Sequence, residues 1–171
     1  MRHTPLFLVS LMLLYTTPAA AQASSIQIQG SDQTQTITCQ GDILLIAGER
    51  NTAAVQGHCA EIRVEGADNN LSFGHADRLT VKGPRQRIRG GTTQTLDLSG
   101  NANTLELALG RSTGPAKAHL KGANNHISVR LTSPADITLE GADNTVRWQG
   151  TAGAADPVIT LRGARNRIVQ D

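Results

Sequence analysis

The sequence predicts an all-β protein, a parallel β-solenoid (β-helix) of about eight coils of 17–22 residues. Three observations predict it: an apolar-x-apolar-x-Gly-x-x-Asn phrase recurs, its glycines lie 17 to 22 residues apart, and the flanking positions repeat in chemical type. The central glycines are Gly30, Gly48, Gly66, Gly83, Gly100, Gly122, Gly141 and Gly163. Matching columns at a nearly fixed period indicate units that stack on their neighbours.

The columns on both sides of each glycine predict two short strands per coil. Two residues before the glycine, every repeat carries an aliphatic side chain: Ile28, Ile46, Val64, Val81, Leu98, Leu120, Leu139 and Leu161. Apolar and polar residues alternate with a period of two on both sides, as in strands with one face inward. The Gly-x-x-Asn segment is the tight turn between them, because glycine adopts dihedral angles that side chains forbid.

A side-chain amide stands three residues after each glycine. The eight amides are Gln33, Asn51, Asn69, Gln86, Asn103, Asn125, Asn144 and Asn166. Equivalent residues of stacked coils lie about 4.8 Å apart, so these amides are expected to form a hydrogen-bonded ladder. Gln33 and Gln86 depart from asparagine, and Gly90 departs from the apolar core column, so those coils are expected to pack less regularly.

A second, looser turn closes each coil and varies in length. It is long at residues 108–117 and again at residues 149–158. In solenoids such insertions often mark the binding face. We therefore predict Arg111, Lys117 and Asp156 as contact residues for a cell-envelope glycan or a partner protein.

The two cysteines, Cys39 and Cys59, both fall in the second turn of adjacent coils. Two cysteines in an exported chain suggest one disulfide, here joining the first coil to the second. Two free thiols are the alternative.

Residues 1–23 are interpreted as a secretory signal peptide. A basic start precedes a short apolar run, and small residues follow at two possible cleavage points, after Ala21 or Ala23. A retained N-terminal anchor is the alternative. Residues 24–171 are then one β-solenoid domain, in a protein that is periplasmic or extracellular.

Composition limits the partners. The formal net charge is only +2 and aromatic residues make up 2% of the chain, so neither a basic patch nor stacking rings favour nucleic acid. No stable membrane insertion is expected, because no apolar run is long enough to span a bilayer. No cofactor is predicted.

One cluster could carry metal chemistry. His58, His75 and Asp77 fall in the second turns of neighbouring coils, and imidazole and carboxylate are suitable ligands for zinc or copper. Exposed turn residues are the alternative. Calcium is disfavoured, because acids such as Asp68 and Asp143 occupy only some of the Gly-x-x-Asn turns. No catalytic residues are predicted, since no acids cluster as hydrolysis of a glycan requires.

The repeat resembles that of the DUF3060 family, as in Val64-Glu65-Gly66-Ala67-Asp68-Asn69-Asn70. The resemblance covers roughly residues 26–171 and implies a small exported bacterial protein of undefined function. It implies no catalytic residues.

The sequence thus predicts an exported, non-catalytic structural or binding module of unknown ligand. A self-associating solenoid, pairing through its open sheet ends as a homo-oligomer, is one alternative. A glycan-active enzyme is the other.

Overall fold

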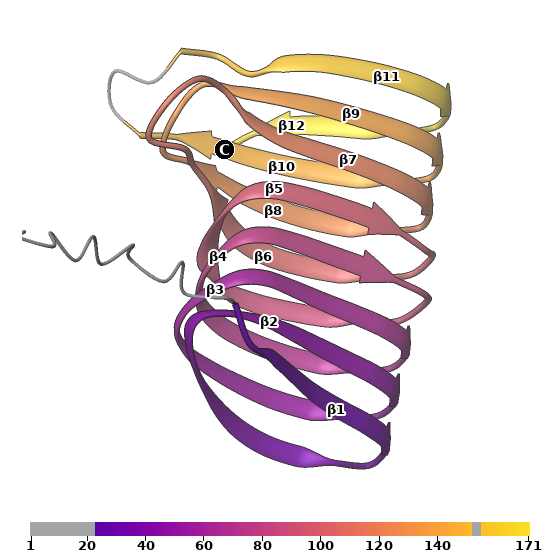
Figure 1. Ribbon diagram of the computed structural model, residues 1–171. Helices are drawn as coiled ribbons and strands as arrows, with labels where there is room; N and C mark the ends of the chain where they lie inside the picture. Colours follow the sequence, from indigo (N-terminus) through magenta and orange to yellow (C-terminus); the bar gives the residue numbers. More distant parts are fainter. Residues whose placement is uncertain (1–22, 152–154) are drawn as a thin grey trace, which may run out of the picture.

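The computed structural model describes residues 23–151 and 155–171, and it forms a parallel β-solenoid of about eight turns. Figure 1 shows the coils stacked along one axis, with equivalent strands above one another. The predicted fold class is confirmed. The predicted signal peptide, residues 1–23, lies outside the described residues except for Ala23.

The twelve strands belong to one sheet, and every strand pair is parallel. They are β1 (Ser25–Ser31), β2 (Thr34–Glu49), β3 (Thr52–Ala67), β4 (Asn70–Lys82), β5 (Arg87–Ser99), β6 (Thr104–Leu109), β7 (Ala116–Ala123), β8 (His126–Leu131), β9 (Ala135–Ala142), β10 (Thr145–Gly150), β11 (Val158–Ala164) and β12 (Arg167–Gln170).

The second turn differs from the prediction in the N-terminal half of the solenoid. Strands β2, β3, β4 and β5 run straight through it, so each joins the second strand of one coil to the first strand of the next. Short connections keep the ladder paired around the bend, as in Gln40 beside His58, with local register shifts. The connections after β6, β8 and β10 interrupt the strand, and the sheet continues as two ladders, β6-β8-β10-β12 and β7-β9-β11.

Each Gly-x-x-Asn turn contains a non-glycine residue with positive φ. The residue two after the glycine has φ of 55–59° in all eight turns: Asp32, Arg50, Asp68, Arg85, Ala102, Asn124, Asp143 and Arg165. The stacking of the coils is a further reason why glycine is needed at the first position of these turns. A Cβ on Gly66 would overlap the carbonyl oxygen of Gly48 in the preceding coil, so the turns can lie on one another only without a side chain there.

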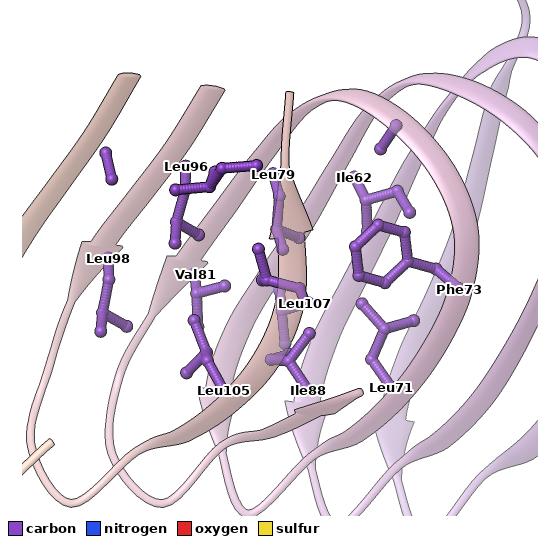
Figure 2. Close-up of a cluster of buried hydrophobic side chains, with 14 of the residues drawn as sticks. Ile62, Leu71, Phe73, Leu79, Val81, Ile88, Leu96, Leu98, Leu105 and Leu107 are labelled. Carbon is purple, nitrogen blue, oxygen red and sulfur yellow. The ribbon is translucent and has the colours of Figure 1, made fainter. Parts of the chain in front are cut away.

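The core is the set of inward columns that the repeat predicted. Figure 2 shows Leu79 and Leu96 stacked from one column and Ile88 with Leu105 from another, and all four side chains are buried. Parallel stacking places like side chains over one another, so these columns fill the middle of the coil with apolar side chains.

Two of the three departures in the repeat, Gly90 and Gln86, lie in one coil and have different outcomes. Gly90 does coincide with an irregularity, because the register shifts between Arg89 and Thr92 and the Phe73 ring occupies the space beside Gly91. Gln86, in the same coil, keeps the amide ladder regular at its own position. Its longer side chain is fully buried and makes the same two bonds to the preceding coil that asparagines make. None of the described residues forms a helix long and apolar enough to cross a bilayer.

Candidate metal centre

The structure brings His58, His75 and Asp77 together on the outside of the second turns of two neighbouring coils. His58 lies in β3, and its backbone pairs with that of His75 in β4. Asp77 is two residues further along β4, so it projects from the same face as His75. One potential ligand atom from each of the three side chains lies within 4.8 Å of the other two.

One oxygen of Asp77 lies close to both imidazole rings. His58 Nε2 is 3.1 Å from Asp77 Oδ1, and His75 Nε2 is 3.6 Å from the same oxygen. The two imidazole rings are tilted by 53°, with centroids 4.7 Å apart. Two nitrogens and one oxygen of this kind suit zinc, copper or nickel.

The cluster is open to solvent on one side and supported on the other. The three side chains are 40–49% exposed, which leaves access for an ion. From the next coil, Gln94 Nε2 donates a hydrogen bond of 2.7 Å to Asp77 Oδ1. Such a partner fixes the orientation of a ligating carboxylate.

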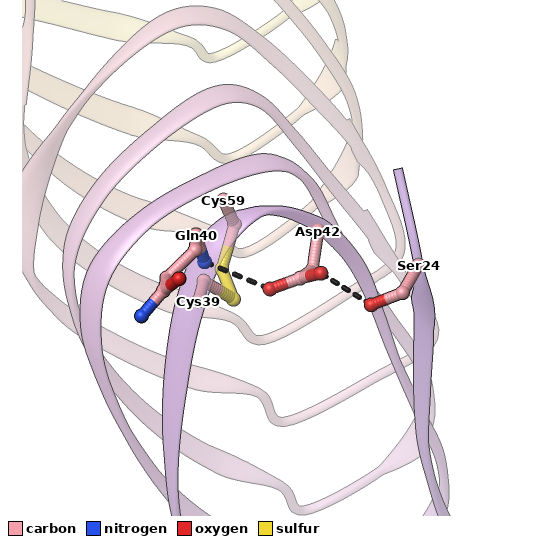
Figure 3. The surroundings of a disulfide bond; sticks show 5 residues. All are labelled: Ser24, Cys39, Gln40, Asp42 and Cys59. Carbon is pink, nitrogen blue, oxygen red and sulfur yellow. Dashed lines mark hydrogen bonds between the residues drawn. A yellow bond between two sulfur atoms is a disulfide. The ribbon is translucent and has the colours of Figure 1, made fainter. Parts of the chain in front are cut away.

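A disulfide holds the bend beside this cluster. Cys39 in β2 is bonded to Cys59 in β3, immediately after His58, and Figure 3 shows it crossing between the two coils. Both cysteines are buried. The predicted pairing therefore anchors the strand from which His58 projects.

Asp42 lies in the second turn of the first coil, three residues after Cys39. Figure 3 shows its carboxylate between Gln40, whose backbone N–H donates at 2.7 Å, and Ser24, whose hydroxyl donates to the other oxygen. These hydrogen bonds, that from Ser24 first, lower the pKa of the Asp42 carboxyl. The hydrogen bond from Ser24 connects the start of the described chain to the turn that leads into the second coil.

The amide column forms a ladder, although not in the expected way throughout. The Asn69 side chain bonds to the preceding coil's backbone: Oδ1 accepts from the Asn51 N–H at 2.9 Å, and Nδ2 donates to the Gly48 carbonyl at 3.0 Å. Among the eight amides of this column, all of them described, direct amide-to-amide bonds occur only from Asn103 onward, for example from Asn125 Nδ2 to Asn144 Oδ1 at 2.9 Å. No buried side-chain nitrogen or oxygen of the described residues lacks a partner.

The turn acids belong to ion pairs that the sequence analysis missed. Asp68 receives two hydrogen bonds of 2.7 Å from the Arg85 guanidinium in the next coil. The same pair forms between Asp32 and Arg50 and between Asp143 and Arg165. These arginines lower the pKa of all three carboxyls. Alternation of acid and arginine two residues after the glycine was the signal in the sequence.

The three predicted contact residues do not form one site. Arg111 is exposed in the connection from β6 to β7, where its backbone N–H donates to Ser133 Oγ at 3.0 Å. Lys117 is not in that connection, because β7 already begins at Ala116. Asp156 is exposed before β11. No hydrogen bond or ion pair joins them among the described residues, and their contact role stays a prediction.

A surface groove lies apart from the cluster. Its lining includes Gly90, Glu106, Arg130, Gln149 and Asp171, and contains none of the predicted site residues. Glycan hydrolysis needs two carboxyl groups that flank the scissile bond, and this groove contains those of Glu106 and Asp171. The Asp171 carboxyl group, however, is bonded to the Arg147 guanidinium at 3.3 Å. The glycan-active enzyme therefore stays a hypothesis.

The candidate metal centre lies inside a stretch that matches a known protein family. Residues 46–101 match the family model DUF3060. Its description is "Protein of unknown function (DUF3060)", and the resemblance seen in the repeat is confirmed over this segment. The DUF3060 segment includes the turns that begin at Gly48, Gly66 and Gly83 and all three candidate ligands. No curated protein and no solved structure gives a significant match to the chain.

Proposed function

We propose that this protein is an exported, non-catalytic binding module that holds a divalent transition-metal ion at His58, His75 and Asp77. The observation that carries the proposal is the convergence of three ligand atoms from two adjacent coils within 4.8 Å. Here two imidazoles and a carboxylate share one face, beside a disulfide that holds the backbone in place.

The spacing fits a first-row metal. Two atoms that each lie about 2.1 Å from a tetrahedral zinc ion are about 3.4 Å apart. The distances from the Asp77 oxygen to the two histidine nitrogens, 3.1 Å and 3.6 Å, bracket that value. The three ligand atoms all lie within 4.8 Å of one another.

The surroundings favour binding over catalysis. The cluster lies on an outward bend, and the groove beside Glu106 does not include it. Metal-assisted hydrolysis needs a shaped cavity that orients substrate and excludes water. Three protein ligands leave one position open, which a group from a glycan or a partner protein could fill.

Export is supported by two independent features. The N-terminal residues have the pattern of a signal peptide, and a disulfide joins Cys39 to Cys59. Disulfides persist in oxidising compartments and are rare in the cytosol. We infer a periplasmic or extracellular location, where the protein would meet metal ions and envelope components.

Zinc titration tests the proposal. Calorimetry should give one ion per chain, and zinc at about 100 times its dissociation constant should raise the free energy of unfolding by about 2.7 kcal/mol. His58→Ala and His75→Ala should each weaken binding more than about 100-fold, because even partners of metal ligands are worth 10–100-fold. Gln94→Ala should weaken it less, since Gln94 only orients Asp77. Binding should also weaken in acid, as imidazole must be unprotonated to bind.

The matched control is His119→Ala, which removes an exposed histidine of β7 far from the cluster. It should bind zinc as the unchanged chain does. Equal affinity in a His58→Ala, His75→Ala double variant would show that zinc binds elsewhere. Absence of stoichiometric binding by zinc, copper and nickel would refute the metal function itself.

A further inference from the structure

We propose that copies of this protein stack head to tail, with the C-terminal end of one solenoid (β11 and β12) against the N-terminal end (β1 and residues 34–40) of another. The inference is independent of the metal centre. It starts from Leu161, which is 50% exposed, although its counterparts one and two coils earlier, Leu139 and Leu120, are 1% and 2% exposed. Leu161 thus presents a core position of the solenoid to solvent.

Both ends also present strand edges. Among the described strands, β11 pairs only with β9, β12 only with β10, and β1 only with β2. The outer edge of each therefore carries backbone donors and acceptors on a flat, extended surface. Such edges are templates for a further strand, and a parallel strand from a second copy would continue the ladder in register.

The amide ladder supplies the polarity. Inside the stack, each amide reaches back to the preceding coil, as Gln86 does when Oε1 accepts from the Asn69 N–H at 3.1 Å and Nε2 donates to the Gly66 carbonyl at 2.7 Å. Gln33 is the same residue type in the same column. Its amide is exposed and donates at 3.1 Å to the nearby Ser31 carbonyl.

The C-terminal end offers the groups that Gln33 would need. In the coil of β11 and β12, the Gly163 carbonyl and the Asn166 N–H hold the positions that Gly66 and Asn69 hold toward Gln86. A second copy placed head to tail would bring Gln33 onto both. Two identical ends placed together would not match the amide with these backbone groups.

Shape and charge agree with this arrangement. The position of a Cβ on Gly30 has no atom within 4 Å, whereas at Gly48 and in the later turns it is filled by the preceding glycine carbonyl. The Gly163 carbonyl of a second copy would enter that space. Arg165 would then stack on Asp32, which continues the alternation that pairs Asp32 with Arg50.

The contact is heterologous, so it does not close on two copies and can extend to longer stacks. Light scattering should therefore show an average mass that rises with concentration beyond one chain. Leu161→Asp should remain monomeric, because it places a carboxylate at the centre of the surface that the second copy would cover. If Leu161→Asp does not fold, Arg165→Glu is the second variant. It would place a carboxylate against Asp32 of the other copy and should also remain monomeric.

Gln33 gives the sharpest pair of variants. Gln33→Ala should raise the dissociation constant about 10-fold or more, because two backbone groups lose their partners. Gln33→Asn should retain association, since asparagine fills this column elsewhere. Ser72→Asp, an exposed change on an inner coil, should have no effect.

Cross-linking tests the polarity. Thr160 and Gln27 occupy the same outward column at opposite ends, and stacked residues about 4.8 Å apart are within disulfide reach. A mixture of Thr160→Cys and Gln27→Cys chains should give a covalent heterodimer on oxidation, while each variant alone should not cross-link. A monomer at every concentration, or cross-linking of Thr160→Cys to itself, would overturn the proposal.

Discussion

The Asn69 amide shows how one side chain connects three coils. Its side chain bonds to Asn51 and Gly48 in the preceding coil, and its backbone N–H donates to Gln86 in the following one. The residue is 1% exposed. A buried amide with every group bonded stabilises the stack and also specifies its register, because a shifted coil would leave donors without acceptors.

Asn69→Ala should lower the free energy of unfolding by about 2–4 kcal/mol, since it leaves a buried N–H and a buried carbonyl unpaired. Urea unfolding measures this loss. Asn70→Ala is the control, because Asn70 is exposed and its change should stay within about 0.5 kcal/mol. Equal losses for the two variants would show that the ladder amide does not contribute as argued.

The turn ion pairs predict how stability responds to acid. Arginine lowers the folded-state pKa of Asp32, Asp68 and Asp143. The stability that they contribute is therefore present above the unfolded aspartate pKa of roughly 3.9 and is lost as pH falls through the lower, folded values.

An Asp32→Asn, Asp68→Asn, Asp143→Asn triple variant should melt at a lower temperature than the unchanged chain at pH 7, and this difference should shrink at pH 2. The effect should be small, because the pairs are exposed and screened by salt. Asp156→Asn, in an exposed connection, is the control. A difference that grows in acid would contradict the pKa assignment.

At the scale of the element, the Gly-x-x-Asn turn depends on stacking as much as on its own dihedral angles. Gly66 and Gly30 have similar φ values, 113° and 104°. Of these two glycines, only Gly66 has the carbonyl of a preceding glycine at the position where a Cβ would lie. The two positions therefore separate the backbone cost of replacing glycine from the cost of pushing two coils apart.

Gly30→Ala should destabilise by about 1–2 kcal/mol, the dihedral cost alone. Gly66→Ala should cost a further 1–3 kcal/mol, typical of forcing a methyl group into filled space. Chemical unfolding of both variants provides the comparison. A Gly66→Ala variant as stable as Gly30→Ala would show that the coils separate without penalty.

For the whole molecule, the disulfide closes a loop between two coils whose cysteines are 20 positions apart. A Cys39→Ser, Cys59→Ser double variant should lose about 3 kcal/mol of stability, mainly because its unfolded chain is less restrained. Unfolding with and without reductant gives the same comparison on the unchanged chain. If reductant leaves the unfolding midpoint unchanged, the bridge does not stabilise the fold.

The loss should extend to zinc binding, because His58 directly precedes Cys59. We expect the double variant to bind zinc more weakly than the oxidised protein, even below its unfolding temperature. Calorimetry on the folded variant measures the difference.

The candidate site was only partly readable from the sequence. His58 and His75 stand ten and nine residues after their glycines, so a simple column count does not align them, and the register shift between Val55 and His58 is what pairs them. No feature of the sequence indicated that Gln94 would bond to Asp77. Lys117 was assigned to a loop because the length of the insertion did not reveal where β7 begins.

The sequence by itself determined the solenoid, its core columns, the amide column and the cysteine pair. These follow from short-range alternation and a repeat period, and stacking identical units makes local patterns into global contacts. Only the tertiary structure decided which strands run through the second bend, how the amides bond, and where His58, His75 and Asp77 converge. Those outcomes depend on register shifts at the bends and on side-chain directions between coils, which arise only when the coils pack against one another.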